Sequence, residues 1–293
     1  MDKESSQAWI AIIVVILVAS GLAWAGSQNS VPAFSMPLFA LCVAIAFVIQ
    51  WIAFIPAWIF QTEKFYDLTG SFTYITVTLL AVFLSGNADG RTYILMALVL
   101  VWALRLGTFL FTRVLKSGKD ARFDEIKVSF ARFLQTWTLQ GLWVSFTLAA
   151  ALAAITTREP VPLGIFALVG LLVWAFGFGI EAVADQQKRR FNAYPENKGD
   201  FIDTGLWAWS RHPNYFGEIT LWLGVAIITL PVLRGWQWVT LISPVFVYLL
   251  ITRISGVPML EKRADEKWGG QEDYEKYKKN TPVLVPKPPK KEE

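Results

Sequence analysis

Eight apolar stretches, most of them close to the length that crosses a lipid bilayer, dominate this 293-residue chain. A transmembrane helix needs about 20 consecutive apolar residues, and a soluble domain does not collect its apolar residues into runs of that length. The chain is 54% hydrophobic. We therefore predict an all-α, polytopic membrane helix bundle. The predicted segments are residues 8–25, 38–60, 72–85, 92–111, 135–155, 161–183, 215–233 and 236–254.

The segment 72–85 is shorter than the length of about 20 residues that a crossing requires, so the sequence is compatible with seven or eight transmembrane helices. We expect residues 1–254 to form the bundle and residues 255–293 to form a tail. The tail ends in PKPPKKEE, and this composition, rich in proline and charge, favours disorder from residue 286 onward.

Lysine and arginine are distributed unevenly between the loops. If the N-terminus faces the cytoplasm, the cytoplasmic loops and tails carry 23 of the 27 basic residues. Basic residues near membrane segments favour the cytoplasmic side. We therefore expect both termini and the long loops in the cytoplasm. The same loops account for the net charge of +4, so no nucleic-acid partner is indicated.

The basic loop before the fifth apolar segment has apolar residues at helix-like spacing. They are Phe123, Ile126, Phe130 and Phe133. Basic residues lie between them and would face away from such a stripe. The pattern predicts an amphipathic helix on the membrane surface within residues 112–134.

The residue content excludes several kinds of site. The chain has one histidine and one cysteine, Cys42, so a zinc site built from histidine and cysteine is excluded, and nothing points to another metal. It contains neither a GxGxxG motif after a strand nor a GxxxxGK[ST] motif. A cofactor would therefore bind between helix ends rather than in a soluble nucleotide-binding domain.

The single histidine, His212, lies in the run SRHPNYFGE at residues 210–218, where a charged loop becomes an apolar segment. Polar and ionisable groups at the edge of hydrocarbon are costly and usually mark a site. Pro213 and Asn214 fit the start of a helix, whose free N–H groups favour an anion. We predict that this run forms part of a polar ligand site.

A second group of charges ends the preceding apolar segment. It comprises Glu181, Asp185, Lys188, Arg189 and Arg190. The two carboxylates are four residues apart and share one helix face. Arginine binds phosphate in a bidentate fork, lysine adds a point charge, and carboxylates accept hydrogen bonds from hydroxyls. The group therefore suits a ligand that carries both phosphates and hydroxyls.

Each of these residues also has a simpler explanation when taken alone. The basic triplet could anchor the helix at the cytoplasmic face. Glu181 could pair with Arg211 or Arg253, and His212 could cap a helix. Because all of them fall on the same predicted side of the membrane, we favour a polar site over separate structural roles.

Three motifs resemble those of a known family. They are DTGLW at 203–207, SRHPNYFGE at 210–218 and EDYEKYKKNTPVLVP at 272–286. On these motifs the chain resembles the steroid 5-alpha-reductase-like membrane family, most closely its bacterial branch, and the resemblance is strongest over residues 175–285. The same core occurs in sterol C14-reductases and in isoprenylcysteine carboxyl methyltransferases. The resemblance implies an integral protein of the bacterial inner membrane.

The resemblance to the reductases further implies that the cytoplasmic loops form a pocket for NADPH. By resemblance, the residues that contact the cofactor are Glu181, Asp185, Asn214, Tyr215, Gly217, Glu218 and Arg253. The charge pattern adds Lys188, Arg189, Arg190, Arg211, His212 and Glu261.

The catalytic residues match the family less closely. Steroid 5-alpha-reductases carry a Gln-Glu pair followed by proline in an early helix and a tyrosine in a later one, which together polarise a 3-keto group. This chain has Gln61-Thr62-Glu63, with one residue inserted and no proline. Our candidates for proton donation are therefore Glu63 with Tyr66 or Tyr74, and a steroid substrate is not specifically implied.

These observations predict NADPH-dependent reduction of a carbon–carbon double bond in a lipid-soluble substrate that is steroid-, sterol- or isoprenoid-like. One alternative is an S-adenosylmethionine-dependent methyltransferase, whose pattern the position of Glu261 resembles. The basic triplet argues against it, because the methyl donor carries no phosphate. The other alternative is a non-enzymatic lipid-binding membrane protein. The sequence does not indicate an oligomeric state.

Overall fold

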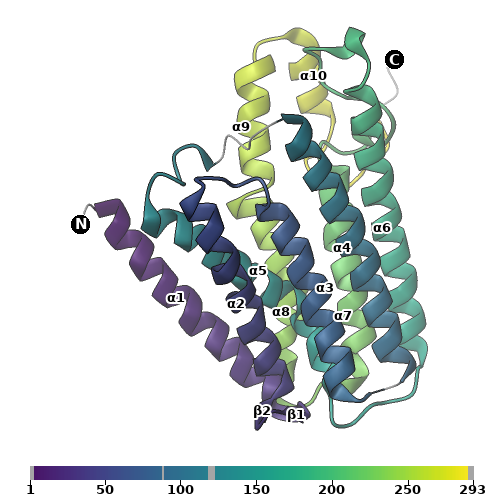
Figure 1. The fold of residues 1–293 in the computed structure, drawn as a ribbon. Helices are drawn as coiled ribbons and strands as arrows, with labels where there is room; N and C mark the ends of the chain where they lie inside the picture. The colour runs from purple at the N-terminus through teal and green to yellow at the C-terminus, as the bar shows by residue number, and fades with distance from the viewer. Residues whose placement is uncertain (1–2, 88, 118–122, 290–293) are drawn as a thin grey trace. The chain divides into compact units, whose positions relative to one another are not determined.

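A computed structural model describes residues 3–87, 89–117 and 123–289 and confirms the all-α prediction (Figure 1). Within these residues, eight segments are long and apolar enough to cross a membrane. The short segment 72–85 proves to be part of α3, Tyr66–Ser85, whose 20 residues are enough for a crossing. The chain is therefore an integral membrane protein with eight candidate spans.

The described chain contains ten α-helices. They are α1 (Lys3–Gly26), α2 (Leu38–Ile59), α3 (Tyr66–Ser85), α4 (Gly90–Ser117), α5 (Phe130–Ile155), α6 (Ile165–Phe191), α7 (Pro213–Thr229), α8 (Ile242–Leu249), α9 (Val257–Trp268) and α10 (Glu272–Asn280). Between α1 and α2, β1 (Pro32–Ala33) and β2 (Met36–Pro37) form an antiparallel hairpin.

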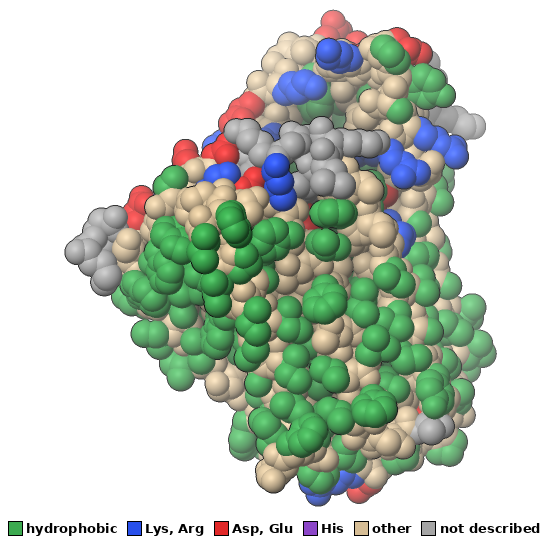
Figure 2. All heavy atoms as spheres, in the orientation of Figure 1, with side chains coloured by type: hydrophobic (Ala, Val, Ile, Leu, Met, Phe, Trp, Pro, Cys, Tyr) green, Lys and Arg blue, Asp and Glu red, His purple; other side chains and the backbone are tan. Residues whose placement is uncertain are grey.

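Apolar side chains cover the outward-facing sides of the helices. In Figure 2 hydrophobic side chains occupy most of the visible helix surfaces, and charged side chains gather near helix ends. Phe83 is 83% exposed and Leu17 is 66% exposed. Large apolar patches of this kind are rare on soluble proteins, and they match the hydrocarbon of a bilayer.

The chain divides into two compact units. Unit 1 comprises Met1–Ala167 and Val225–Ser243, and unit 2 comprises Leu168–Gly224 and Pro244–Glu293. Unit 1 contains α1 to α5. Unit 2 contains most of α6, the first three turns of α7, the last six residues of α8, and α9 and α10.

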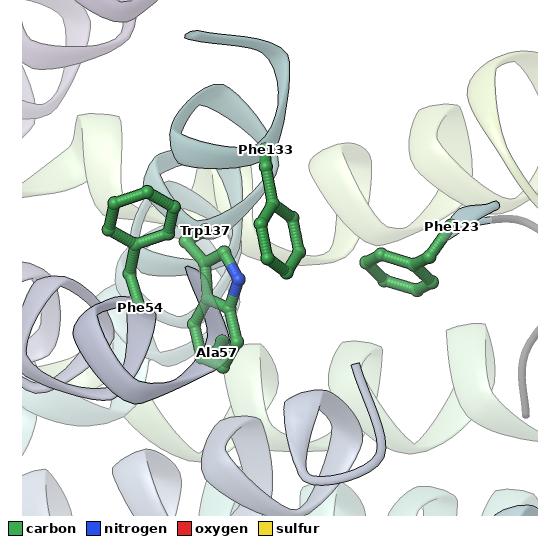
Figure 3. Close-up of a cluster of buried hydrophobic side chains, with 5 residues drawn as sticks. All are labelled: Phe54, Ala57, Phe123, Phe133 and Trp137. Carbon is green, nitrogen blue, oxygen red and sulfur yellow. The ribbon is translucent and has the colours of Figure 1, made fainter. Parts of the chain in front are cut away.

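Helix α5 forms the centre of unit 1, where it contacts α1, α2, α3 and α4. In its apolar window 78% of residues are buried, a larger share than in any other candidate span. An aromatic cluster surrounds its first turns (Figure 3). The buried members of this cluster are Phe54, Ala57, Phe123, Phe133 and Trp137.

The predicted amphipathic surface helix is wrong in the part that the structure describes. Residues 123–129 form turns, and α5 begins at Phe130, while residues 118–122 lie outside the described chain. Phe123 is 4% exposed, and its ring packs edge-on against Tyr66 with 5.0 Å between centroids. The helix-like spacing arises because aromatic side chains enter the core from both a turn and a helix, which periodicity alone does not distinguish from a surface stripe.

A buried arginine joins distant parts of unit 1. Arg91, in the first turn of α4, is 2% exposed, and its guanidinium donates to the carbonyl oxygens of Ile228 at 3.1 Å, Pro162 at 3.2 Å and Val161. Asp89 caps the same helix by accepting from Arg91 N at 2.8 Å. The guanidinium thus links α4 to two other segments of unit 1 through their carbonyl oxygens.

In unit 2, glycines bring the backbones of α6 and α7 into direct contact. A Cβ atom at Gly177 would lie 2.5 Å from Leu221 N, and a Cβ atom at Gly217 would lie 2.6 Å from Glu181 N. Farther along, a Cβ atom at Gly224 would lie 2.6 Å from Trp174 N. Small residues allow membrane helices to approach this closely. The contact places the first turn of α7 beside the C-terminal half of α6.

The last apolar segment is not one regular helix. Gly235–Leu241 is a 3₁₀-helix, α8 follows it, and Leu250–Ile254 is a π-helix. The helical segment then ends, and α9 begins after Gly256, where a Cβ atom would lie 2.9 Å from the ring of Tyr215. Single π turns are rare and occur often at functional sites.

Candidate functional site

The C-terminal half of α6 carries two buried carboxylates. Glu181 and Asp185 lie one turn apart and are 2% and 7% exposed. Asn214, in the first turn of α7, donates from Nδ2 to Asp185 Oδ1 at 3.2 Å. The structure therefore brings together three of the residues that the sequence analysis selected.

A second polar group joins the loop before α7 to α9. Glu261 accepts a hydrogen bond from His212 Nε2 at 2.7 Å on Oε1. Its Oε2 lies 2.7 Å from Arg211 Nη1, in an ion pair that lacks hydrogen-bond alignment. Tyr215 stacks on the imidazole at 5.7 Å between centroids. Sequence analysis considered Glu181 as a partner of Arg211, and the structure shows Glu261 in that place.

His212 is a buried, neutral imidazole at pH 7. Burial lowers the pKa of His212 below its usual value of 6.5, and the effect of burial outweighs that of Glu261, which raises the pKa. Because a carboxylate only accepts, Nε2 carries the proton. Nδ1 is then an acceptor, and within the described residues it has no hydrogen-bond partner.

The three basic residues at the end of α6 differ in their surroundings: Lys188 packs on an aromatic ring, and Arg189 and Arg190 are exposed. Lys188 Nζ lies 4.4 Å above the ring of Trp207 in a cation–π contact. Arg189 contacts the side chain of Gln186, and both Arg189 and Arg190 are exposed. Cations in the last turn of a helix are also favoured by its dipole. The two exposed guanidinium groups remain accessible to an anion.

The DTGLW motif folds back onto α6. Gly205 has a φ of +62°, a conformation that favours glycine, and a Cβ atom there would lie 2.5 Å from the amide of Gln187. Trp207 donates from Nε1 to Ala184 O at 3.0 Å. Sequence analysis recognised the motif but not its role, which is to hold Trp207 beneath Lys188.

The C-terminal tail lies along the loop that carries His212. Arg211 N donates to Pro282 O at 2.9 Å, and Ser210 Oγ donates to Leu284 O at 2.8 Å. Lys287 N donates to Trp209 O at 2.9 Å. The motifs at 210–218 and 272–286, which carry the family resemblance, are therefore adjacent in space.

Two further candidates of unit 2 occupy less central positions. Glu218 is half-buried on α7, one turn after Asn214. Arg253 lies in the π-helix and is exposed, and it has no hydrogen-bond or ion-pair partner in the described part of the chain. The structure thus does not show Arg253 joined to the buried polar groups.

In unit 1, Glu63 is held by a lysine that sequence analysis did not select. Lys127 Nζ lies 2.8 Å from Glu63 Oε2, and the glutamate side chain is only 2% exposed. The hydrogen bond to Glu63 raises the pKa of Lys127. The ion pair stabilises the carboxylate form of Glu63, which accepts protons and hydrogen bonds rather than donating them. No local pattern predicts this contact, because the partners are 64 residues apart.

The two tyrosine candidates lie at different levels of α3. Tyr66 donates from its hydroxyl to Thr136 O at 3.1 Å, and its backbone N–H donates to Glu63 O at 2.9 Å. Tyr74 is buried and packs edge-on against Trp102 with 5.0 Å between centroids. Eight residues of helix separate them by about 12 Å along the axis. The structure therefore groups Glu63 with Tyr66 and leaves Tyr74 apart.

Comparison with known proteins gives a family without a described activity. The family model described as "Protein of unknown function (DUF1295)" matches residues 53–281. The chain belongs to the DUF1295 family. No curated protein and no solved structure matches the chain. The DUF1295 match contains every candidate site residue in both units, from Glu63 to Glu261.

Within the described residues of this DUF1295 protein, no group of three or more histidine, cysteine, aspartate or glutamate side chains is arranged to hold a metal ion. Two acidic side chains of the candidate site contact an amide, a guanidinium and an imidazole. Asp185 contacts Asn214, and Glu261 contacts Arg211 and His212.

Deleting residues 281–293 is expected to destabilise the protein, because the deletion removes the tail hydrogen bonds to residues 209–211. The loss should be about 2–4 kcal/mol, since each such bond contributes about 0.5–1.5 kcal/mol. Deleting only residues 288–293 spares these bonds and serves as the control. The apparent melting temperature in detergent checks both variants, and equal melting temperatures would show that the tail does not hold this loop.

Proposed function

We propose that this DUF1295 protein is a membrane-embedded, NADPH-dependent reductase of a carbon–carbon double bond in an apolar, lipid-soluble substrate. The observation that carries the proposal is the composition of the C-terminal half of α6. Two buried carboxylates, Glu181 and Asp185, are followed on the same helix by two exposed arginines, Arg189 and Arg190. This order suits a ligand with ribose hydroxyls next to phosphates.

The residues present fit the cofactor chemically. Glu181 and Asp185 are acceptors for ribose hydroxyls, and the exposed guanidinium groups match phosphates in a bidentate fork. The N-terminal end of α7 adds the positive end of a helix dipole, which favours an anion. His212 Nδ1 adds a buried acceptor that has no partner among the described residues. The donor set therefore offers a match for each part of a phosphorylated dinucleotide.

The chain's own residues account for binding and proton supply. Bound NADPH supplies a hydride to an electron-poor carbon. The second hydrogen must arrive as a proton, and a positioned acid is worth about 10²–10⁴ in rate. Lys127 holds Glu63 as a carboxylate, so we assign proton delivery to a tyrosine. Tyr66 is the first candidate, because it neighbours Glu63, and Tyr74 is the second.

The resemblance to steroid 5-alpha-reductase-like proteins supports the same reaction class. It also supports a bacterial inner-membrane location with cytoplasmic termini, together with the excess of basic residues in one set of loops. The Gln-Thr-Glu sequence at 61–63 departs from the family pattern. We therefore assign the substrate only as steroid-, sterol- or isoprenoid-like.

One observation favours the methyltransferase alternative. Arg211, which precedes His212 in the chain, is already paired with Glu261, so this pair presents little net charge to a phosphate. S-adenosylmethionine needs no phosphate partner. The two cofactors therefore differ in their dependence on Arg189 and Arg190.

Parallel titrations of the detergent-purified full chain with NADPH, NADH and S-adenosylmethionine test the proposal. A ligand at 100 times its Kd stabilises the folded form by about 2.7 kcal/mol, which raises the melting temperature. We expect NADPH to bind more tightly than NADH. We also expect the Arg189→Ala/Arg190→Ala variant to bind NADPH at least about tenfold more weakly, because hydrogen bonds to charged groups contribute about 1.5–3 kcal/mol.

A charge-matched control is the Lys198→Ala/Lys279→Ala variant, which removes two exposed cations of unit 2 outside this group. It should bind NADPH as the unmodified chain does. Stabilisation by S-adenosylmethionine alone would replace the reductase with a methyltransferase. No stabilisation by any of the three ligands would favour a non-enzymatic lipid-binding protein.

A further inference from the structure

Glu261 contacts one nitrogen of the His212 imidazole and one nitrogen of the Arg211 guanidinium, and each of these planar groups has another nitrogen without a partner in the described part of the chain. It takes His212 Nε2 on one oxygen and Arg211 Nη1 on the other, each at 2.7 Å. His212 Nδ1 and Arg211 Nε are buried, and neither has a hydrogen-bond partner within the described residues. His212 as a whole is 5% exposed. Buried polar nitrogens without partners are rare and call for an explanation.

The two nitrogens differ in kind. With its proton on Nε2, His212 presents Nδ1 as an acceptor, whereas Arg211 Nε always donates. A carboxylate or phosphate would satisfy the arginine but would bring no donor to Nδ1. A hydroxyl or a water can form a hydrogen bond with either nitrogen. A planar group that carries an N–H beside an acceptor can form hydrogen bonds with both nitrogens at once.

We infer that Arg211 and His212 together recognise a neutral, planar group that offers an N–H donor to His212 Nδ1 and an acceptor to Arg211 Nε. The inference rests on the proposed function and deepens it. NADPH contains two groups of this chemistry, the nicotinamide carboxamide and the amino edge of adenine. Glu261 then acts as a positioning residue, because it fixes the tautomer of His212 from α9.

The same geometry makes recognition dependent on pH. Protonated His212 would carry N–H groups on both nitrogens and would repel the donor of the ligand. The charged groups that face the imidazole are Glu261 from α9, Lys188 from α6 and Arg211 from its own loop, while Tyr215 of α7 stacks on it. Both cations disfavour protonation. Binding should therefore be constant above the usual pKa of 6.5 and should fall as the pH drops through the lower pKa of the folded protein.

Two dinucleotide analogues test the inference by calorimetric titration of the full chain in detergent. The reduced 3-acetylpyridine analogue of NADPH replaces the carboxamide NH₂ with a methyl group, and the hypoxanthine analogue replaces the adenine amino group with oxygen. We expect one of them to bind about tenfold more weakly than NADPH, because it leaves a buried acceptor without its donor. The analogue that is discriminated identifies the group that contacts His212.

Two variants of His212 separate recognition from folding. The amide of His212→Gln lies near the former Nε2 and keeps the contact with Glu261 while it removes the acceptor at Nδ1. It should bind NADPH and the discriminated analogue equally. The amide of His212→Asn lies near the former Nδ1, so this variant should keep the discrimination and lose the pH dependence. Melting temperatures without ligand show that each variant is folded.

Three results would overturn the inference. In the first, the unmodified protein binds both analogues as tightly as NADPH. In the second, folded His212→Gln still discriminates between NADPH and the analogue. The third is the absence of any NADPH binding, which removes the proposed function itself and is distinguished from the other two by the parent titration.

Discussion

Replacing Gly177 or Gly217 with alanine is expected to destabilise the protein by about 1–3 kcal/mol each, the usual cost of overpacking. The new methyl group at either position would lie within 2.7 Å of backbone atoms of the facing helix. Backbone atoms cannot rotate away as a side chain would, so α6 and α7 would have to separate. The separation would also move Asn214 away from Asp185, which it contacts at 3.2 Å.

Whether the alanine variants are destabilised or stabilised distinguishes helix packing from helix propensity. Alanine is the better helix former by about 1 kcal/mol, so propensity alone predicts that both variants are stabilised. Gly179 provides the control on the same helix, because a Cβ atom there has nothing within 4 Å. Gly179→Ala should leave the melting temperature unchanged or raise it. If Gly177→Ala and Gly217→Ala behaved like Gly179→Ala, the close approach of the two helices would be wrong.

The eight spans were predictable because hydrocarbon imposes a simple rule on sequence. A helix that crosses a bilayer must be apolar over about 20 residues, and this requirement does not depend on tertiary contacts. The start of α3 was missed because its first turns contain Asp67 and Thr69, which are polar. Gln140 of α5 donates to Tyr66 O at 3.2 Å in this first turn, which shows how protein contacts replace apolar composition there.

The residues of the candidate site were predictable as a group, but their partners were not. The clustering of ionisable residues at the edge of apolar segments selected Asp185, His212 and Glu261. Their pairing depends on how the glycines of α6 and α7 and the break at Gly256 place the helices, which has no local signature. Sequence analysis therefore considered Glu181 as the partner of Arg211, whereas α9 supplies Glu261.

Replacing Lys127 with methionine is expected to destabilise the protein by about 3 kcal/mol, because it removes the ammonium group that lies 2.8 Å from the buried Glu63 carboxylate. The unmodified protein should lose stability at high pH. Since the pKa of Lys127 is raised in the folded state, its contribution is complete below the ordinary value of 10.5 and is lost as the pH rises through the folded-state pKa. The Lys127→Met variant should lack this loss.

Replacing both partners separates the structural role of the ion pair from a role in the reaction. The Glu63→Gln/Lys127→Met variant removes both charges of the ion pair, so it should recover most of the stability lost in Lys127→Met. Lys64→Met, at an exposed neighbouring lysine, controls for the loss of one charge and should melt as the unmodified protein does. A double variant no more stable than Lys127→Met would contradict the ion-pair account. If the double variant is stable and binds NADPH but does not turn over an identified substrate, Glu63 acts in the reaction beside Tyr66. If its turnover is normal, the Glu63–Lys127 ion pair contributes only to stability.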